Sequence, residues 1–166
     1  MLRTCLNTSD ALIYGAGDAK LGSIVGGGAR EGRELQDRFL RNLPKLGRLI
    51  ERVQRASQRG YLIALDGRKL YVRGQHSALN TLLQGAGAIV MKVSLCYLWK
   101  WVNKEGLDAL KVIDMHDEGV AEVIPEHAER FKELAVRSIV KAGEFFKLNV
   151  PLDADARIGK SWAEIH

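Results

Sequence analysis

Two short apolar runs separated by an acidic turn constrain the fold of this chain more than any other feature. The runs cover residues 110–115 and 119–124, and each has the length and the β-branched content of a strand. Between them lie His116, Asp117 and Glu118. Because strands joined by so short a turn pair with each other, the pattern predicts an antiparallel hairpin with carboxylates at its tip.

An acidic hairpin turn has two interpretations. Carboxylates fixed on a rigid hairpin can present hard oxygen ligands to Mg²⁺. An acidic turn is also a common surface turn that binds nothing. The strands beside Asp117 and Glu118 are too apolar for an exposed ribbon, which favours the metal interpretation. Asp114 is not expected to be a ligand, because Met115 separates it from the tip.

The first third of the chain predicts short helices. Residues 12–28 contain six glycines, which indicates turns and close backbone contacts. Residues 30–59 carry apolar stripes with helical spacing, interrupted at Pro44, so we expect one helix to end and another to begin there. The Arg and Lys side chains on the opposite faces are interpreted as solvated helix surface.

The middle of the chain predicts a second hairpin and a long helix. Residues 61–73 contain two short apolar runs around Asp66-Gly67, a dipeptide typical of tight hairpin turns. From Ser77 to Trp101, apolar side chains recur on one helix face. We therefore expect a hairpin followed directly by a helix.

The last part of the chain predicts one more helix. Pro125 is expected at its first turn, where proline is tolerated. The tail beyond Pro151 is expected to form a short strand and a loop. No internal repeat or composition break demands a second independent domain, and the fold class predicted for the chain is α/β (α+β).

Charge and composition narrow the functional classes. The 166 residues include 25 Lys and Arg against 20 Asp and Glu, and the net charge of +5 favours a polyanionic partner without requiring one. The first ten residues lack the apolar segment of a secretory signal, and the uncharged stretch 74–91 is too polar to span a bilayer. Cys5 and Cys96 lack metal-type spacing. We expect a cytoplasmic protein without a membrane partner.

Four segments, in order along the chain, resemble DNA polymerase family A, and the phage-type members most closely. Residues 115–118 resemble motif C, the V-H-D-E hairpin of the family's palm. Residues 65–92 resemble the run before it, with a G-R strand turn and an A-x-N-x-x-x-Q helix, and residues 12–22 resemble the end of the fingers helix. The terminal G-x-x-W-x-x-x-H pattern falls on Gly159, Trp162 and His166.

The resemblance implies roles for individual side chains. Asp117 is implied to hold Mg²⁺, with Glu118 as its acidic neighbour, and both are candidate catalytic residues. Asn80 and Gln84 are four residues apart and share a helix face, where amides can check base-pair shape through minor-groove acceptors common to all pairs. The implied DNA-binding residues are Tyr14, Arg68, His76, Asn80, Gln84 and His116.

The chain departs from the family before Tyr14. Family members carry a motif A carboxylate upstream of the fingers helix, and an R-x-x-x-K pattern on that helix binds the incoming triphosphate. Counting back from Tyr14 in steps of four, the corresponding positions hold Asp10, Leu6 and Leu2. Because two-metal phosphoryl transfer needs carboxylates from two places, we expect the chain alone to be inactive.

The resemblance implies a partial polymerase palm, with an antiparallel motif C hairpin packed on helices, plus distal fingers helices. Residues 1–11 are expected to be an unrelated or divergent start, residues 12–59 distal fingers helices, and residues 60–166 the C-terminal part of the palm.

The expected function is that of the C-terminal part of a template-directed DNA polymerase. The implied partners are primer–template DNA, dNTP, Mg²⁺ and an N-terminal polymerase half that carries motif A. In a virus, the site of action would be the host cytoplasm. A non-catalytic DNA-binding fragment or decayed remnant remains the alternative function, whereas a stand-alone Mg²⁺ nuclease would need further carboxylates that no motif supplies.

Overall fold

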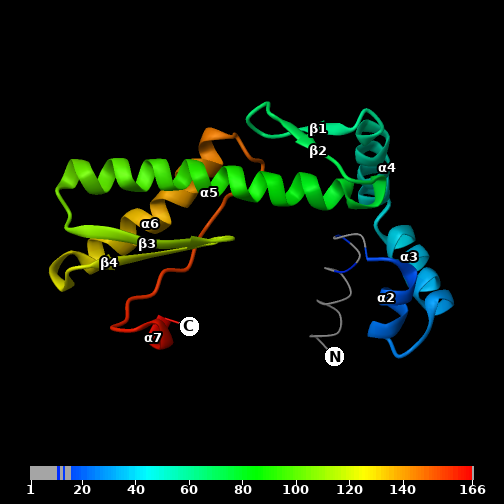
Figure 1. Cartoon of the computed structure of the whole chain (residues 1–166), viewed down its shortest axis with the longest axis horizontal. Helices are drawn as coiled ribbons and strands as arrows, with labels where there is room; N and C mark the ends of the chain where they lie inside the picture. The colour runs from blue at the N-terminus through cyan, green and yellow to red at the C-terminus, as the bar shows by residue number, and fades with distance from the viewer. Residues whose placement is uncertain (1–10, 12, 14–15, 166) are drawn as a thin grey trace. The chain divides into compact units, whose positions relative to one another are not determined.

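The computed structural model describes residues 11, 13 and 16–165, which combine helices with two small antiparallel hairpins (Figure 1). This confirms the mixed α and β composition predicted from the sequence. The chain forms two compact units, divided between Gly85 and Ala86.

The first unit opens with the helices α2 (Asp18–Ile24), α3 (Ala29–Asn42) and α4 (Pro44–Ser57). Pro44 occupies the first turn of α4, where the missing N–H is not needed, and Leu43 before it takes a non-helical conformation with φ −125°. The predicted break at Pro44 is therefore confirmed.

Two glycines allow α2 and α3 to approach each other closely. A Cβ atom at Gly22 would lie 1.9 Å from the carbonyl oxygen of Gly28, and one at Gly32 would lie 1.9 Å from the carbonyl oxygen of Asp18. Both obstacles are backbone atoms, which cannot rotate away. The close contacts expected from the glycine-rich segment are therefore real and belong to this helix pair.

A hairpin and the start of a long helix complete the first unit. Strands β1 (Tyr61–Ile63) and β2 (Lys69–Tyr71) pair antiparallel, and Gly67 in the turn has φ +85°. The short 3₁₀ helix η1 (Gln75–Ser77) then leads into α5 (Ala78–Glu105). The core of this unit consists of Val53, Leu62, Ala78 and Leu79.

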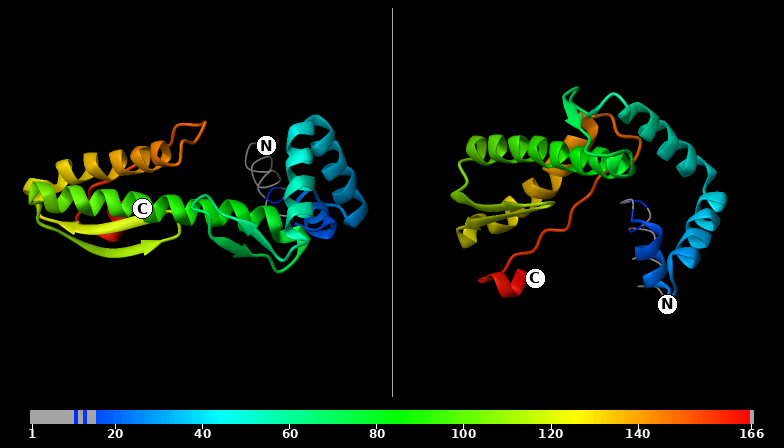
Figure 2. Two further views of the ribbon diagram at one scale, coloured as in Figure 1. Left: turned by 90° about the horizontal axis from the view of Figure 1, so that it is seen from above. Right: turned by 45° about the vertical axis from the view of Figure 1, so that its right-hand side comes forward.

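In the second unit, strands β3 (Ala109–Met115) and β4 (Glu118–Val123) form the predicted acidic hairpin, followed by α6 (Pro125–Phe145). Figure 2 shows the hairpin and α6 on different sides of α5. The buried residues that join α5 to α6 are Leu98, Val102 and Leu134.

An ion pair reinforces the contact between α5 and α6. Arg130 donates two hydrogen bonds to Glu105, from Nε at 2.7 Å and from Nη2 at 2.8 Å. These hydrogen bonds hold the pKa of Glu105 below its ordinary value. Both side chains are partly exposed, so the pair fixes the geometry of the helix ends more than it stabilises the fold.

The apolar character of α5 has two interpretations. One 18-residue window reaches a mean hydropathy of 1.4, so by length and composition alone the helix could cross a membrane. A core helix passes the same test. Ala78 and Leu79 belong to one core and Leu98 and Val102 to the other, and 17% of the window is buried inside the structure.

The prediction of a short strand after Pro151 is wrong. Residues 151–159 are irregular, and the short helix α7 (Trp162–Ile165) follows. A strand needs a neighbour to pair with, and β3 and β4 pair only with each other among the described residues. Instead, the Leu152 side chain packs on α6, where its Cγ would lie 3.0 Å from a Cβ atom at Gly143.

Gly32→Ala is expected to destabilise the chain by about 3 kcal/mol, because its new methyl group meets backbone atoms of α2. The matched control is Gly47→Ala in α4, where a Cβ atom would meet nothing within 4 Å. That variant is expected to stabilise by about 0.5–1 kcal/mol through helix propensity. Urea denaturation measures both, and equal effects would contradict the assigned α2–α3 packing.

Candidate functional site

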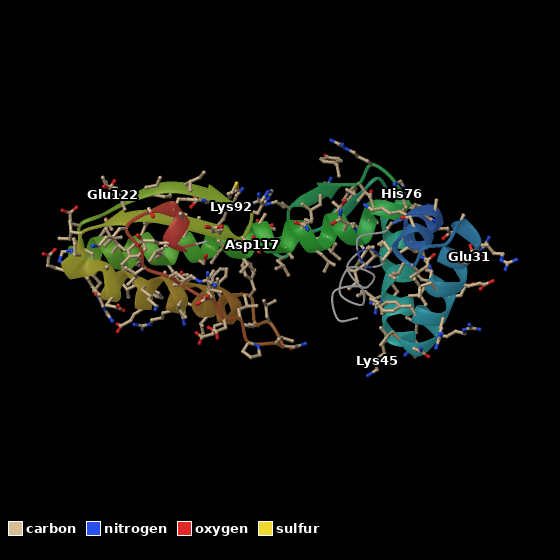
Figure 3. All side chains as sticks on the ribbon, turned by 90° about the horizontal axis from the view of Figure 1, so that it is seen from below. Glu31, Lys45, His76, Lys92, Asp117 and Glu122 are labelled. Atoms are coloured by element: carbon tan, nitrogen blue, oxygen red, sulfur yellow. The ribbon has the colours of Figure 1, made fainter. Side chains whose placement is uncertain are left out.

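The acidic tip of the β3–β4 hairpin is a two-residue turn. Met115 pairs with Glu118, which leaves only His116 and Asp117 in the turn; Asp117 is labelled in Figure 3. His116 has φ 56°, a left-handed conformation that side chains rarely adopt, whereas Asp117 does not share it. The first central position of such turns normally holds glycine. The protein therefore keeps a histidine where the backbone favours glycine, which is typical of residues retained for function.

An irregularity in β3 contributes to the direction of the tip. Lys111 pairs with Ala121 and Ile113 with Val120, so Val112 is the extra residue of a β-bulge. Bulges bend a strand and often occur next to functional sites, because they redirect the side chains beyond them. The bulge lies in β3, a few residues before the turn.

The carboxylates around the tip differ in their surroundings. Asp117 is exposed and Glu118 is half-buried. Asp114 accepts a 2.6 Å hydrogen bond from Lys111 Nζ on the same strand. Its charge is therefore balanced locally by Lys111.

The described residues do not form a complete metal site. Among them there is no group of three His, Cys, Asp or Glu side chains that could hold a metal ion. Mg²⁺ typically binds one or two carboxylates and completes its shell with water and substrate phosphates. Asp117 at the exposed tip fits as one ligand of such a shell.

The predicted DNA-binding residue Arg68 follows the β1–β2 turn and is bound to Asp66. Its Nε donates a 2.6 Å hydrogen bond to Asp66 Oδ2, and its backbone N–H donates to Oδ1 at 3.2 Å. Partial burial alone would raise the pKa of Asp66, but the hydrogen bonds and charge of Arg68 hold it below its ordinary value. Any phosphate or base that binds Arg68 must compete with this carboxylate.

Three of the five other predicted DNA-binding residues lie where α5 begins. His76 is exposed in η1, Asn80 is half-buried and Gln84 is exposed, at intervals of four residues. The Oδ1 atom of Asn80 is buried and has no hydrogen-bond partner among the described residues. Unsatisfied buried polar atoms are rare, and a missing ligand or water is a common explanation.

The structure brings Arg68 near the same helix segment. In β2, the Leu70 side chain packs on α5, where its Cδ1 would lie 2.6 Å from a Cβ atom at Gly85. The hairpin that carries Arg68 therefore packs on the segment that carries Gln84. Asp117, Glu118 and His116 belong to the second unit. Tyr14 lies outside the described residues, as do Leu2, Leu6, Asp10 and His166.

One feature of the first unit was interpreted from the sequence only as solvated surface. The exposed basic residues of α4 recur at intervals of three and four, a spacing that places them on a single face. The same spacing is visible in the sequence and could have identified the surface there.

Comparison with known proteins gives a consistent result. The sequence profile of DNA polymerase family A matches residues 9–164. A DNA-directed DNA polymerase of Escherichia phage Phieco32 is 47% identical over 94% of this chain and 26% of its own length. The DNA-directed DNA polymerase of Escherichia phage T7 is 35% identical over 93% of the chain and 25% of its own length. The chain thus spans about a quarter of the length of these curated relatives.

A solved structure also resembles the chain. It is the POL domain of Pol1 from M. smegmatis in complex with DNA primer-template and dNTP. The TM-score is 0.76 and the identity 20%, over 84% of this chain and 27% of the other. At this level of identity the match shows a shared fold.

His116→Gly is expected to stabilise the protein by about 0.5–1 kcal/mol, because glycine adopts a positive φ without the strain of a side chain. His116→Ala keeps the Cβ atom and serves as the control, with no gain expected. Urea denaturation of both variants tests the strain. Equal stability of the two variants would show that the turn is not strained at this position.

Proposed function

The chain belongs to DNA polymerase family A, and we propose that it supplies the C-terminal part of a template-directed DNA polymerase. The main observation in support is the two-residue turn that exposes Asp117 at the end of a paired hairpin. An exposed carboxylate on a rigid turn is suited to phosphoryl transfer, in which positioning and electrostatic stabilisation provide most of the catalysis.

Each residue of the tip has a proposed task. Asp117 binds Mg²⁺, Glu118 adds negative charge beside it, and His116 faces the primer end. When bound, Mg²⁺ stabilises the charge that develops on the transferred phosphoryl oxygens. The second carboxylate comes from a motif A segment, in the same or another polypeptide, because the described residues do not supply a complete ligand set.

The first unit is proposed to contact primer–template DNA near the insertion site. Arg68, His76, Asn80 and Gln84 contact the strands in the minor groove, and Tyr14 stacks near the templating base. The side-chain amides of Asn80 and Gln84 support this role, because each carries N–H donors that suit the minor-groove acceptors common to all base pairs.

Three regions follow from the same proposal. Residues 1–11 are a divergent start, residues 12–59 are distal fingers helices, and residues 60–166 are the C-terminal part of the palm. The proposed site of action is the cytoplasm of a host cell, and the proposed partners are primer–template DNA and dNTP, which the similar solved structure contains.

The surface of β3 supports a partner segment beside the hairpin. β3 pairs only with β4 among the described strands, and six of its seven residues are exposed. Leu110 is 67% exposed and Val112 is 62% exposed. An unpaired strand edge with large apolar side chains is a surface that proteins normally cover. We propose that the strand of motif A covers it.

The chain alone is expected to lack primer-extension activity, and a complex with a segment that carries motif A is expected to extend primers when Mg²⁺ is present. Asp117→Asn keeps the size of the side chain and removes its charge, so extension should fall at least about 1,000-fold while the complex still forms. A primer-extension assay with a parallel binding measurement tests this.

The matched control is Asp114→Asn, because Asp114 lies on the same hairpin but is paired with Lys111. This variant should retain extension within about threefold. Unchanged extension by Asp117→Asn, or an equal loss in both variants, would overturn the assignment of Asp117. A complex that forms and extends no primers would favour the non-catalytic alternative.

The chain alone is also expected to self-associate through β3. Leu110→Lys/Val112→Lys places charges on this edge and should shift the chain towards monomer, because charged edge residues oppose strand pairing. Val150→Lys/Ile158→Lys alters two other exposed apolar residues outside any strand and is the control. Sedimentation velocity measures both. An equal response of the two variants would contradict a role for the edge of β3.

A further inference from the structure

A stripe of basic side chains follows one face of α4. It consists of Lys45, Arg48, Arg52, Arg55 and Arg59, separated by three or four residues, with Arg59 just beyond the end of the helix. This spacing keeps the residues of the helix on one face and separates successive cations by about 4.5–6 Å along the axis. All five residues are exposed. In Figure 3, the side chain of Lys45 points away from the helix.

The stripe carries charge that its neighbours do not balance. None of its members takes part in the ion pairs found among the described residues, which involve Arg30, Arg68, Lys111, Arg130, Lys141 and Arg157. Glu51 is the one acidic residue in the sequence of α4. The stripe therefore presents a row of cations to solvent.

The charge of the whole first unit has the same sign. Residues 1–85 contain 14 Lys and Arg against 7 Asp and Glu, a net charge of +7, whereas residues 86–166 contain 11 against 13, a net charge of −2. A field of one sign over one unit attracts polyanions and raises their rate of association.

A shallow groove of about 550 Å³ runs beside the stripe, between α4 and β1. Three arginines of the stripe, Arg52, Arg55 and Arg59, contribute to its lining. The apolar residues that line it are Leu49, Val53, Ala56, Leu62, Ile63 and Leu82. The groove thus combines guanidinium groups with an apolar surface.

Two tyrosines lie where the stripe ends. The Arg59 guanidinium is 4.8 Å from the centre of the Tyr61 ring, and Lys69 Nζ is 4.6 Å from it. Tyr71 pairs with Tyr61 across the hairpin and is 77% exposed. A largely exposed aromatic ring beside cations is an available stacking surface for a base.

We propose that α4 and the β1–β2 hairpin form a track for a single strand of nucleic acid, with phosphates along the stripe and a base on Tyr71. Proteins that bind single strands combine a cationic path with aromatic stacking surfaces. Four of the five cations are arginines, which bind phosphate with two hydrogen bonds. An exposed ring next to a row of guanidinium groups is the combination that single-strand-binding proteins use, so the single strand is the proposed occupant.

This track goes beyond the proposed polymerase function. It uses none of the residues assigned to the metal or to the minor groove, and it binds without a primer terminus. Its failure would therefore leave the assignment of Asp117 intact, and the loss of primer extension in Asp117→Asn would leave the track intact.

The test is fluorescence anisotropy with labelled oligo(dT) of 20 nucleotides and the full 166-residue chain. Five phosphate contacts predict that the logarithm of the binding constant falls with the logarithm of salt concentration at a slope of about −3.5. The variant Arg48→Gln/Arg52→Gln/Arg55→Gln should weaken binding at least about tenfold and reduce the slope to about −1.4.

The charge-matched control is Lys92→Gln/Lys100→Gln/Lys104→Gln, which removes three exposed cations from the part of α5 in the second unit. It should weaken binding no more than about twofold. An equal loss of affinity in the two triple variants would show that binding depends only on total charge, and it would overturn the proposed track. Circular dichroism checks that both triple variants fold, since all six side chains are exposed.

A second pair of variants tests stacking independently of charge. Tyr71→Ala should weaken binding of oligo(dT) by about 5–10-fold, and Tyr71→Phe should retain it, because phenylalanine keeps the ring. An effect of the same size for both would exclude stacking. Poly-glutamate is then tested as a competitor of oligo(dT). If it displaces oligo(dT) equally well from the wild-type chain and from Tyr71→Ala, the surface is assigned to an acidic polypeptide instead.

Discussion

The structure depends on α5, because neither hairpin could persist without a helix to pack on. A two-stranded hairpin alone is marginally stable in water. The β1–β2 hairpin buries Leu62 against Ala78 and Leu79 at the start of α5. Further along the helix, Leu95 lies 4.0 Å from the position of a Cβ atom at Gly119 in β4. Within each unit, the part of α5 that belongs to it therefore packs on the hairpin of that unit.

The candidate site also shows how rigid support and local strain combine. Only the pairing of Met115 with Glu118 closes the turn, and His116 accepts a positive φ within it. Such strain persists when the surrounding structure over-determines the conformation. The β3–β4 pairing provides that determination, and the bulge at Val112 adds a bend to the strand. Without β4 as the partner of β3, the Asp117 carboxylate would lose its fixed position as well.

The sequence predicted the elements well and their interactions poorly, for physical reasons. Helical spacing, Pro44, Pro125 and the Asp66-Gly67 turn depend on local conformational preference, which one segment carries by itself. The pairing of Arg68 with Asp66 and the bulge in β3 depend on how elements meet, which periodicity does not encode. The prediction of a strand after Pro151 was wrong for the same reason, because a strand requires a neighbour as well as an apolar run.

The distribution of charge gives a reason for separating DNA binding from the catalytic tip. A carboxylate that holds a metal also repels phosphate until the metal arrives, and the second unit has a net charge of −2. In the proposed function, affinity for nucleic acid therefore comes from cations elsewhere. The first unit, with a net charge of +7, provides them on α4 and at the β1–β2 turn. In the proposed function, nucleic acid would bind to the first unit, and the acidic tip would lie in a unit whose negative net charge leaves few cations to compete with Mg²⁺ for the carboxylate.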